Sequence, residues 1–273
     1  MQISLINFTR IPDSDVQLVV RAVNRQLHED FRQHWNHDAT LRLEGRVDLG
    51  PAFKGSLKPA ELRGDAILYL YDGPPDVGGA LGYHDAQSAG IPYGFVFTEI
   101  SRELKEPWSV TLSHEVLELV ADAHVNKLAR GPHPDDPGRQ VFHWFEMCDA
   151  VQAEHYRIDG VGVSNFVLPL YFTPDAEPGG RNDFLGSGLA SFGVNPGGYI
   201  GYFDPLTGKN ETFAMRLDKL AAQRRELKQP TRHAGRSARR ASEAPMHTPA
   251  RPPERSKSGP TTIPVRKGGR RTG

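Results

Sequence analysis

One segment limits the possible folds of this chain more than any other. Residues 108–129, WSVTLSHEVLELVADAHVNKLA, have the length of a helix and are mostly apolar, which predicts a helix buried in a core. His114, Glu115 and Glu118 lie inside this segment. Charged side chains are costly to bury unless other groups pair with them. The fold must therefore bring partners to these three residues.

The spacing of these residues is that of a metal-binding helix. His114 and Glu118 are four positions apart, so both side chains can reach one ion from the same helix face. Glu115 projects beside that face and could act as general base on a metal-bound water, as in the H-E-x-x-H zinc helix. Here Glu118 stands where the second histidine would be. An oxygen ligand is acceptable to Zn²⁺ but makes the site less selective against other divalent metals.

The region resembles two known families. Its H-E-x-x-E pattern is similar to that of the zincin metallopeptidases, in which a sheet with a mixed edge precedes the metal helix and a downstream acidic residue completes the site. It also resembles the EXORDIUM-like (phosphate-induced) proteins of plants, through SHEVLELVADA (113–123), Trp144, and Glu146 and Asp149 on either side of Cys148. The resemblance implies an α+β fold, with a zincin-like mixed sheet packed on a metal-binding helix.

The third metal ligand has several candidates. Glu146 is the favoured one, because a Glu from the following helix is a common way to complete such a site. Asp149 would then orient His114. Asp149 and His143 are also open as the ligand itself. His124 is the other alternate, since it follows His114 by the ten positions that metzincins use. Those enzymes turn the chain at a glycine, where this sequence has Ala121.

His84 and Cys148 are two further residues that could take part in chemistry at the motif. His84 lies in GALGYHD, an expected edge strand, and we predict that it is catalytic, hydrogen-bonding a substrate carbonyl or oxyanion. Cys148 is the single cysteine of the chain and has no Cys-His spacing signature, so a small core residue is expected there.

Hydrophobic periodicity and turn residues predict the remaining elements. Helices are expected at 15–31, at 108–129 and from about residue 144 within 141–156, and a loop at 131–140. In the first helix, one face carries the apolar residues Val16, Val19, Val20, Val23, Leu27 and Phe31. Strands are expected at 3–8, 40–47, 66–72, 79–85, 93–100 and 166–172. Asp159-Gly160 predicts a type I′ hairpin turn, and 204–213 predicts a second hairpin.

The formal net charge of zero conceals two unlike parts. Residues 228–273 contain 12 Lys and Arg against 2 Asp and Glu, a net charge of +10 that leaves −10 for residues 1–227. The last 46 residues include seven prolines and no aromatic residue, which predicts a disordered basic tail after a single catalytic domain over 1–227. The tail could make weak, salt-sensitive contacts with nucleic acid or an acidic surface.

The remaining sequence signals favour a soluble, cytoplasmic protein. No apolar run is long enough to span a bilayer and no signal peptide is visible, so no membrane partner is expected. The leading hypothesis is a zinc-dependent hydrolase acting on a peptide or protein, with another divalent metal as an option. The alternative is a non-catalytic zincin-like binding or structural protein with a vestigial or structural metal site.

Overall fold

The computed structural model describes residues 1–47, 64–73, 82–86, 90–173 and 180–215. The chain divides into two units, Met1–Ser237 and Ala238–Gly273, and every described residue belongs to the first. The predicted disordered tail over 228–273 lies outside the described residues. Helices and two main sheets are both present, so the α+β class expected from the sequence is confirmed.

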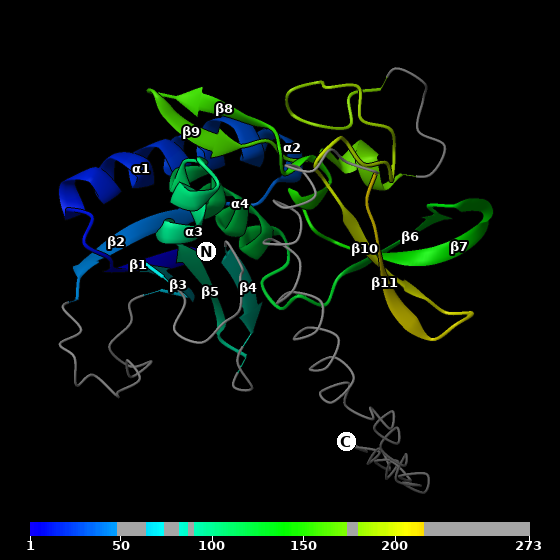
Figure 1. Ribbon diagram of the computed structural model, residues 1–273, viewed down its shortest axis with the longest axis horizontal. Helices are drawn as coiled ribbons and strands as arrows, with labels where there is room; N and C mark the ends of the chain where they lie inside the picture. The colour runs from blue at the N-terminus through cyan, green and yellow to red at the C-terminus, as the bar shows by residue number, and fades with distance from the viewer. Residues whose placement is uncertain (48–63, 74–81, 87–89, 174–179, 216–273) are drawn as a thin grey trace, which may run out of the picture. The chain divides into compact units, whose positions relative to one another are not determined.

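A five-stranded mixed sheet forms one side of the fold (Figure 1). Its strand order is β2-β1-β3-β5-β4, in which the first four strands are parallel and β4 runs antiparallel to β5 at the edge. The strands are β1 (Gln2–Phe8), β2 (Thr40–Arg46), β3 (Ala66–Tyr71), β4 (Gly82–Ala86) and β5 (Pro92–Phe97). All five were predicted, although β5 ends at Phe97, where α3 (Thr98–Glu103) begins.

The first predicted helix is confirmed as a long helical segment that changes its winding. It consists of α1 (Asp13–Arg25), the π-helix η1 (Gln26–Phe31) and α2 (Arg32–Trp35). The predicted apolar face is buried in the main core: Val16, Val19, Val20, Val23, Leu27 and Phe31. A π-turn inside a helix widens it locally, and here the widened turn contains the buried polar residue Gln26.

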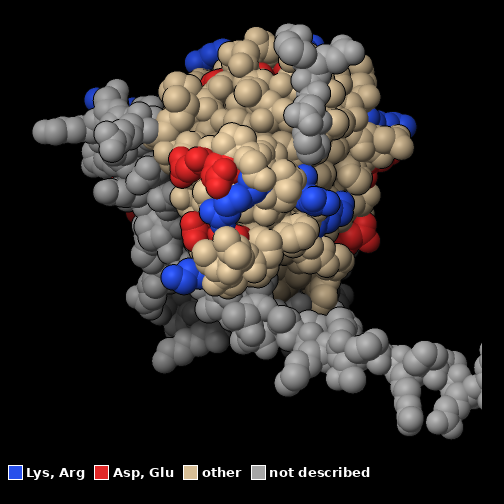
Figure 2. All heavy atoms as spheres, turned by 90° about the vertical axis from the view of Figure 1, so that its right-hand side faces the viewer, with Lys and Arg blue, Asp and Glu red and all other residues tan. Residues whose placement is uncertain are grey.

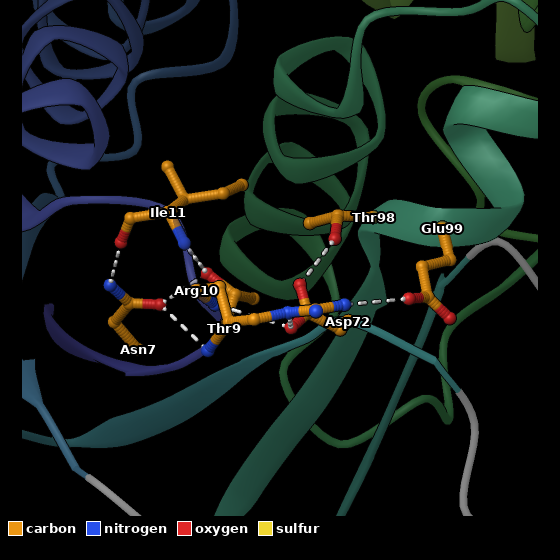
Figure 3. A network of polar contacts seen from close by, with 7 residues as sticks. All are labelled: Asn7, Thr9, Arg10, Ile11, Asp72, Thr98 and Glu99. Carbon is orange, nitrogen blue, oxygen red and sulfur yellow. Dashed lines mark hydrogen bonds and ion pairs between the residues drawn. The ribbon is translucent and has the colours of Figure 1, made fainter.

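A polar network joins the ends of three parallel strands (Figure 3). Near the end of β1, the Asn7 side-chain amide donates to the backbone carbonyl of Ile11 at 2.9 Å. The Arg10 guanidinium pairs with Asp72, which follows β3, at 3.2 Å and with Glu99 of α3 at 3.5 Å. The Arg10 side chain is 78% exposed, so these ion pairs contribute little to the free energy of unfolding. Their main effect is to hold the loops after β1 and β3 next to α3.

The helix that carries the motif, α4 (Trp108–Ala121), is buried along its length from Ser109 to Ala121. It contacts β4 and β5 of the mixed sheet and β9 of a hairpin (Figure 1). The predicted extension to residue 129 is wrong. The helix ends at Ala121, because Asp122 leaves the helical conformation and its carboxylate accepts hydrogen bonds from the backbone N–H groups of Asn126 and Lys127.

A second, four-stranded antiparallel sheet has the order β11-β10-β7-β6. Its strands are β6 (Leu128–His133), β7 (Asp136–Trp144), β10 (Ile200–Asp204) and β11 (Lys209–Phe213). The hairpin predicted at 204–213 is confirmed as β10 and β11. Among the described residues on the face drawn in Figure 2, acidic and basic side chains are interspersed.

A separate hairpin of β8 (His155–Ile158) and β9 (Val161–Ser164) confirms the predicted Asp159-Gly160 turn. Both turn residues have positive φ, 50° for Asp159 and 82° for Gly160, as a type I′ turn requires.

Three sequence predictions in this region are wrong. In place of the helix expected from about residue 144, Trp144 is the last residue of β7 and pairs with β6, and the short 3₁₀ helix η3 (Asp149–Val151) follows. The loop expected at 131–140 contributes residues to the β6–β7 hairpin. The strand expected at 166–172 is reduced to one bridge at Val167 and the 3₁₀ helix η4 (Pro169–Phe172), because Pro169 lacks the N–H that a ladder needs.

No helix among the described residues is long and apolar enough to cross a membrane.

Gln26 connects three elements beneath the motif. Its side-chain nitrogen donates to the Ser164 carbonyl of β9 at 2.8 Å, and its oxygen accepts from the Ser113 hydroxyl of α4 at 2.6 Å. Ser113 in turn accepts from the backbone N–H of Ser164 at 2.9 Å. This closed set of bonds fixes α4 against η1 and the β8–β9 hairpin.

We expect Gln26→Leu to lower the free energy of unfolding by about 2–4 kcal/mol, because it leaves buried polar groups of Ser113 and Ser164 without their partner. Denaturant unfolding followed by circular dichroism measures the change. Gln33→Leu, on the exposed face of α2, is the matched control and should stay within about 0.5 kcal/mol of the wild type. Equal losses in the two variants would contradict the role of Gln26.

Candidate metal centre

The three motif residues of α4 are enclosed by protein. His114 is 6% exposed, Glu115 1% and Glu118 0%. Because α4 is buried on every face, its ionisable side chains contact other elements of the protein instead of water. Whatever these side chains contact must compensate for their lost hydration.

His114 and Glu118 are brought together, as their spacing predicts. His114 Nε2 lies 3.2 Å from Glu118 Oε1 and 3.2 Å from Asp149 Oδ1. The same Glu118 oxygen accepts from the backbone N–H of Cys148 at 3.2 Å. The segment after β7 therefore meets the helix motif directly, and Asp149 is buried at 3% exposure.

Cys148 belongs to this cluster, which sequence reasoning did not foresee. The thiol is fully buried, and its sulfur lies within 4.8 Å of ligand atoms of His114 and Glu118. Burial raises the pKa of the Cys148 thiol well above its ordinary value, and the nearby carboxylate of Glu118 raises this pKa further. The expectation of a small core residue is met by its burial, yet its position also makes it a potential sulfur ligand. In the sequence, the position of Cys148 between the candidate ligands Glu146 and Asp149 could have indicated this role.

His84 approaches the motif from the edge strand β4. Its Nδ1 lies 3.5 Å from Glu115 Oε2 and 3.7 Å from Glu118 Oε2. His84 is 0% exposed and faces α4. Its predicted contact with a substrate carbonyl stays a prediction, and its observed neighbours are the two glutamates.

The remaining ligand candidates lie in different surroundings. Glu146 is 9% exposed and sits in the short connection between β7 and η3. His124 lies in the turn after α4 and is exposed. Among the described residues, two buried groups could hold a metal ion: His114, Glu118 and Cys148, and His84, Glu115 and Glu118. Neither Glu146 nor His124 belongs to these groups. The ligand role of Glu146, with His124 and Asp149 as alternates, stays a prediction.

These donors fit a divalent metal ion. Imidazole nitrogen, carboxylate oxygen and thiolate sulfur are the ligands that Zn²⁺ takes in proteins. A carboxylate-rich set also suits Mn²⁺ or Fe²⁺, so the donors alone do not decide which metal binds. The buried cluster is thus compatible with a metal site of undetermined metal.

The loop after residue 194 fixes Asp149. The backbone N–H of Tyr199 donates to the Asp149 carbonyl at 3.1 Å, and a Cβ added at Gly198 would collide with the Ala150 carbonyl oxygen. Tyr171 lies nearby: burial raises the pKa of its phenol, and the charge of Asp149 adds to the increase. Its hydroxyl donates to the Gly193 carbonyl at 2.9 Å. Asp149 therefore reaches His114 from a firmly packed turn.

Comparison with protein-family models, with curated proteins and with solved structures gives no match to this chain. The assignment of function therefore depends on the residues and their geometry.

Gly82 allows β4 to pass close to the motif. A Cβ at this position would lie 2.8 Å from the Phe95 carbonyl oxygen and 2.9 Å from Glu115 Oε1. The carbonyl oxygen is backbone in the adjacent strand β5 and cannot move aside cheaply. A side chain here would displace β4, and with it His84.

We expect Gly82→Ala to destabilise the protein by about 1–3 kcal/mol through overpacking and to weaken metal binding. Differential scanning calorimetry measures the first effect and titration with Zn²⁺ the second. Gly90→Ala, at a positive-φ position with open space around its Cβ, controls for the loss of a glycine and should leave zinc affinity unchanged. Unaltered zinc affinity in Gly82→Ala would argue against close packing of β4 on the site.

Proposed function

We propose that this chain is a metal-dependent hydrolase of zincin type, with a peptide or protein as substrate and Zn²⁺ as the metal. The observation that carries the proposal is the contact of His114 Nε2 with both Glu118 Oε1 and Asp149 Oδ1. Glu115 is the residue after His114 on the same buried helix. This is the arrangement that an H-E-x-x-E metal helix requires.

The topology is consistent with the proposal. A mixed sheet with an antiparallel edge strand precedes α4 in the chain, and β4 and β5 pack against this helix. A zincin places its metal helix after such a sheet and takes another acidic ligand from further along the chain. Here the segment 146–149 supplies acidic residues in that position.

In this proposal His114 and Glu118 hold the ion. Glu146, Cys148 or Asp149 provides the third ligand, and the remaining acidic residues of this segment orient the others. A bound divalent ion would act as a Lewis acid, polarising a carbonyl group and lowering the pKa of water. Glu115 would accept the proton of the attacking water and pass it to the leaving amine.

A second candidate function is favoured by the depth of the site. Glu118 and Cys148 are both 0% exposed, and a thiol among the donors is typical of closed structural zinc sites. The same residues would then stabilise a non-catalytic binding or structural protein. The two functions differ in the effect of replacing Glu115, which only the hydrolase needs for chemistry.

For a hydrolase, we expect Glu115→Gln to keep its metal and lose hydrolysis by about 10²–10⁴-fold, since the proton acceptor is gone. His114→Ala should lose both metal and activity. Metal content of the purified proteins and turnover of a quenched-fluorescent peptide library are the two measurements. Glu103→Gln, on the exposed surface of α3, is the control and should resemble the wild type.

Wild-type protein that holds no divalent metal even after reconstitution would exclude the hydrolase and the structural metal site, and would leave a binding protein with a vestigial site. Metal retained in wild type and Glu115→Gln, with no hydrolysis by either, would favour the structural site. Single substitutions of Glu146, Cys148 and Asp149 would then identify the third ligand by the loss of metal affinity.

A further inference from the structure

The two buried groups of possible ligands share one residue, Glu118. Its Oε1 faces His114 Nε2 at 3.2 Å, while its Oε2 faces His84 Nδ1 at 3.7 Å. The two carboxylate oxygens therefore point to different imidazoles from different elements, His114 on α4 and His84 on β4. We propose that His84, Glu115 and Glu118 form a second divalent-cation site, bridged by Glu118 to the site at His114.

The distances in this second group suit an ion between the atoms. His84 Nδ1 lies 3.5 Å from Glu115 Oε2 and 3.7 Å from Glu118 Oε2, longer than an ordinary N–H···O hydrogen bond of about 2.7–3.2 Å. Ligands bound at about 2.0–2.2 Å around a tetrahedral ion lie about 3.3–3.6 Å from one another. All three ligand atoms are within 4.8 Å of each other. A small inward shift would bring all three atoms within bonding distance of one ion, leaving a fourth position for water.

Charge and burial favour a second cation. His84, Glu115 and Glu118 are 0%, 1% and 0% exposed, and Asp149 adds a third carboxylate to the cluster at His114. In their ionised form the three carboxylates carry a formal charge of −3, of which one divalent ion offsets two charges. In a buried site of low dielectric the remaining charge strongly attracts another cation.

The donor set indicates the class of ion. One imidazole and two carboxylates suit Zn²⁺, Mn²⁺ or Fe²⁺, and exclude a soft monovalent ion that prefers sulfur. Two-metal sites commonly place their ions about 3.5–4 Å apart, which one bridging carboxylate can span.

A second ion would change the role of Glu115. As a ligand, its carboxylate could not accept a proton from water, so filling the second site should slow hydrolysis at high metal concentration. This inhibitory effect rests on the proposed function. The binding of the second cation does not, and its test needs no substrate.

The test is equilibrium dialysis of the full chain against Zn²⁺, followed by measurement of bound zinc per chain. We expect about two zinc ions in the wild type, about one in His84→Ala and about one in His114→Ala. Glu118→Gln should weaken both sites. His133→Ala is the matched control, because His133 is also buried but lies in the second sheet, and it should bind as the wild type does.

A measurement on the wild type avoids any folding defect of the variants. Protein saturated with Mn²⁺ should give the electron paramagnetic resonance spectrum of a coupled pair of ions, because one carboxylate bridges them. A spectrum of isolated Mn²⁺ only would overturn the second site. His84→Asn, which removes the imidazole but stays polar, repeats the zinc test if His84→Ala fails to fold.

The stoichiometry separates this inference from the proposed function. One zinc ion that is kept in His84→Ala and lost in His114→Ala would overturn the second site and leave the hydrolase proposal intact. One zinc ion that is lost in His84→Ala and kept in His114→Ala would support binding at His84 and refute the ligand role of His114. Two ions in both wild type and His84→Ala would also overturn the inference.

Discussion

The burial of carboxylates on a central helix is the constraint on which the rest of the structure depends. Glu115 and Glu118 are almost completely removed from water on α4. Burying an ionised carboxylate costs several kcal/mol unless charge and hydrogen bonds compensate. The chain therefore surrounds α4 with groups that can compensate: His84 from β4, and the backbone N–H of Cys148 from the segment after β7. The mixed sheet and the β8–β9 hairpin hold these elements in place.

Local sequence patterns predicted the elements whose partners lie close along the chain. The apolar face of residues 16–31 and the Asp159-Gly160 turn were confirmed, because periodicity and turn chemistry are local properties. The segment from about Trp144 was misread as the start of a helix. Trp144 instead ends β7 and pairs with Leu128, and β7 also pairs with Tyr202 and Phe203 of β10, about sixty positions away. Aromatic residues such as Trp144 fit either structure, so the distant strand decided the outcome.

The candidate site was predictable only where its residues lie close together in the sequence. His114 and Glu118 lie one helical turn apart, and that spacing alone brings them together. His84 comes thirty residues earlier, and its contact with Glu115 arises from the packing of β4 on α4, which no local pattern encodes. Cys148 was judged by its lack of a histidine partner in sequence, whereas the fold places it beside His114.

Glu118 ties the stability of the fold to any metal that binds. Its ligand partners come from β4, α4 and the segment 148–149, which lie far apart in the unfolded chain. The site therefore cannot exist before these elements have assembled, so metal binding free energy adds to folding free energy. Without metal, the same carboxylates would have to be compensated by protons or by the two histidines. The need to compensate buried carboxylates links the polar residues of α4 to the packing around them. The residues that could hold an ion are also those whose burial most requires a compensating cation.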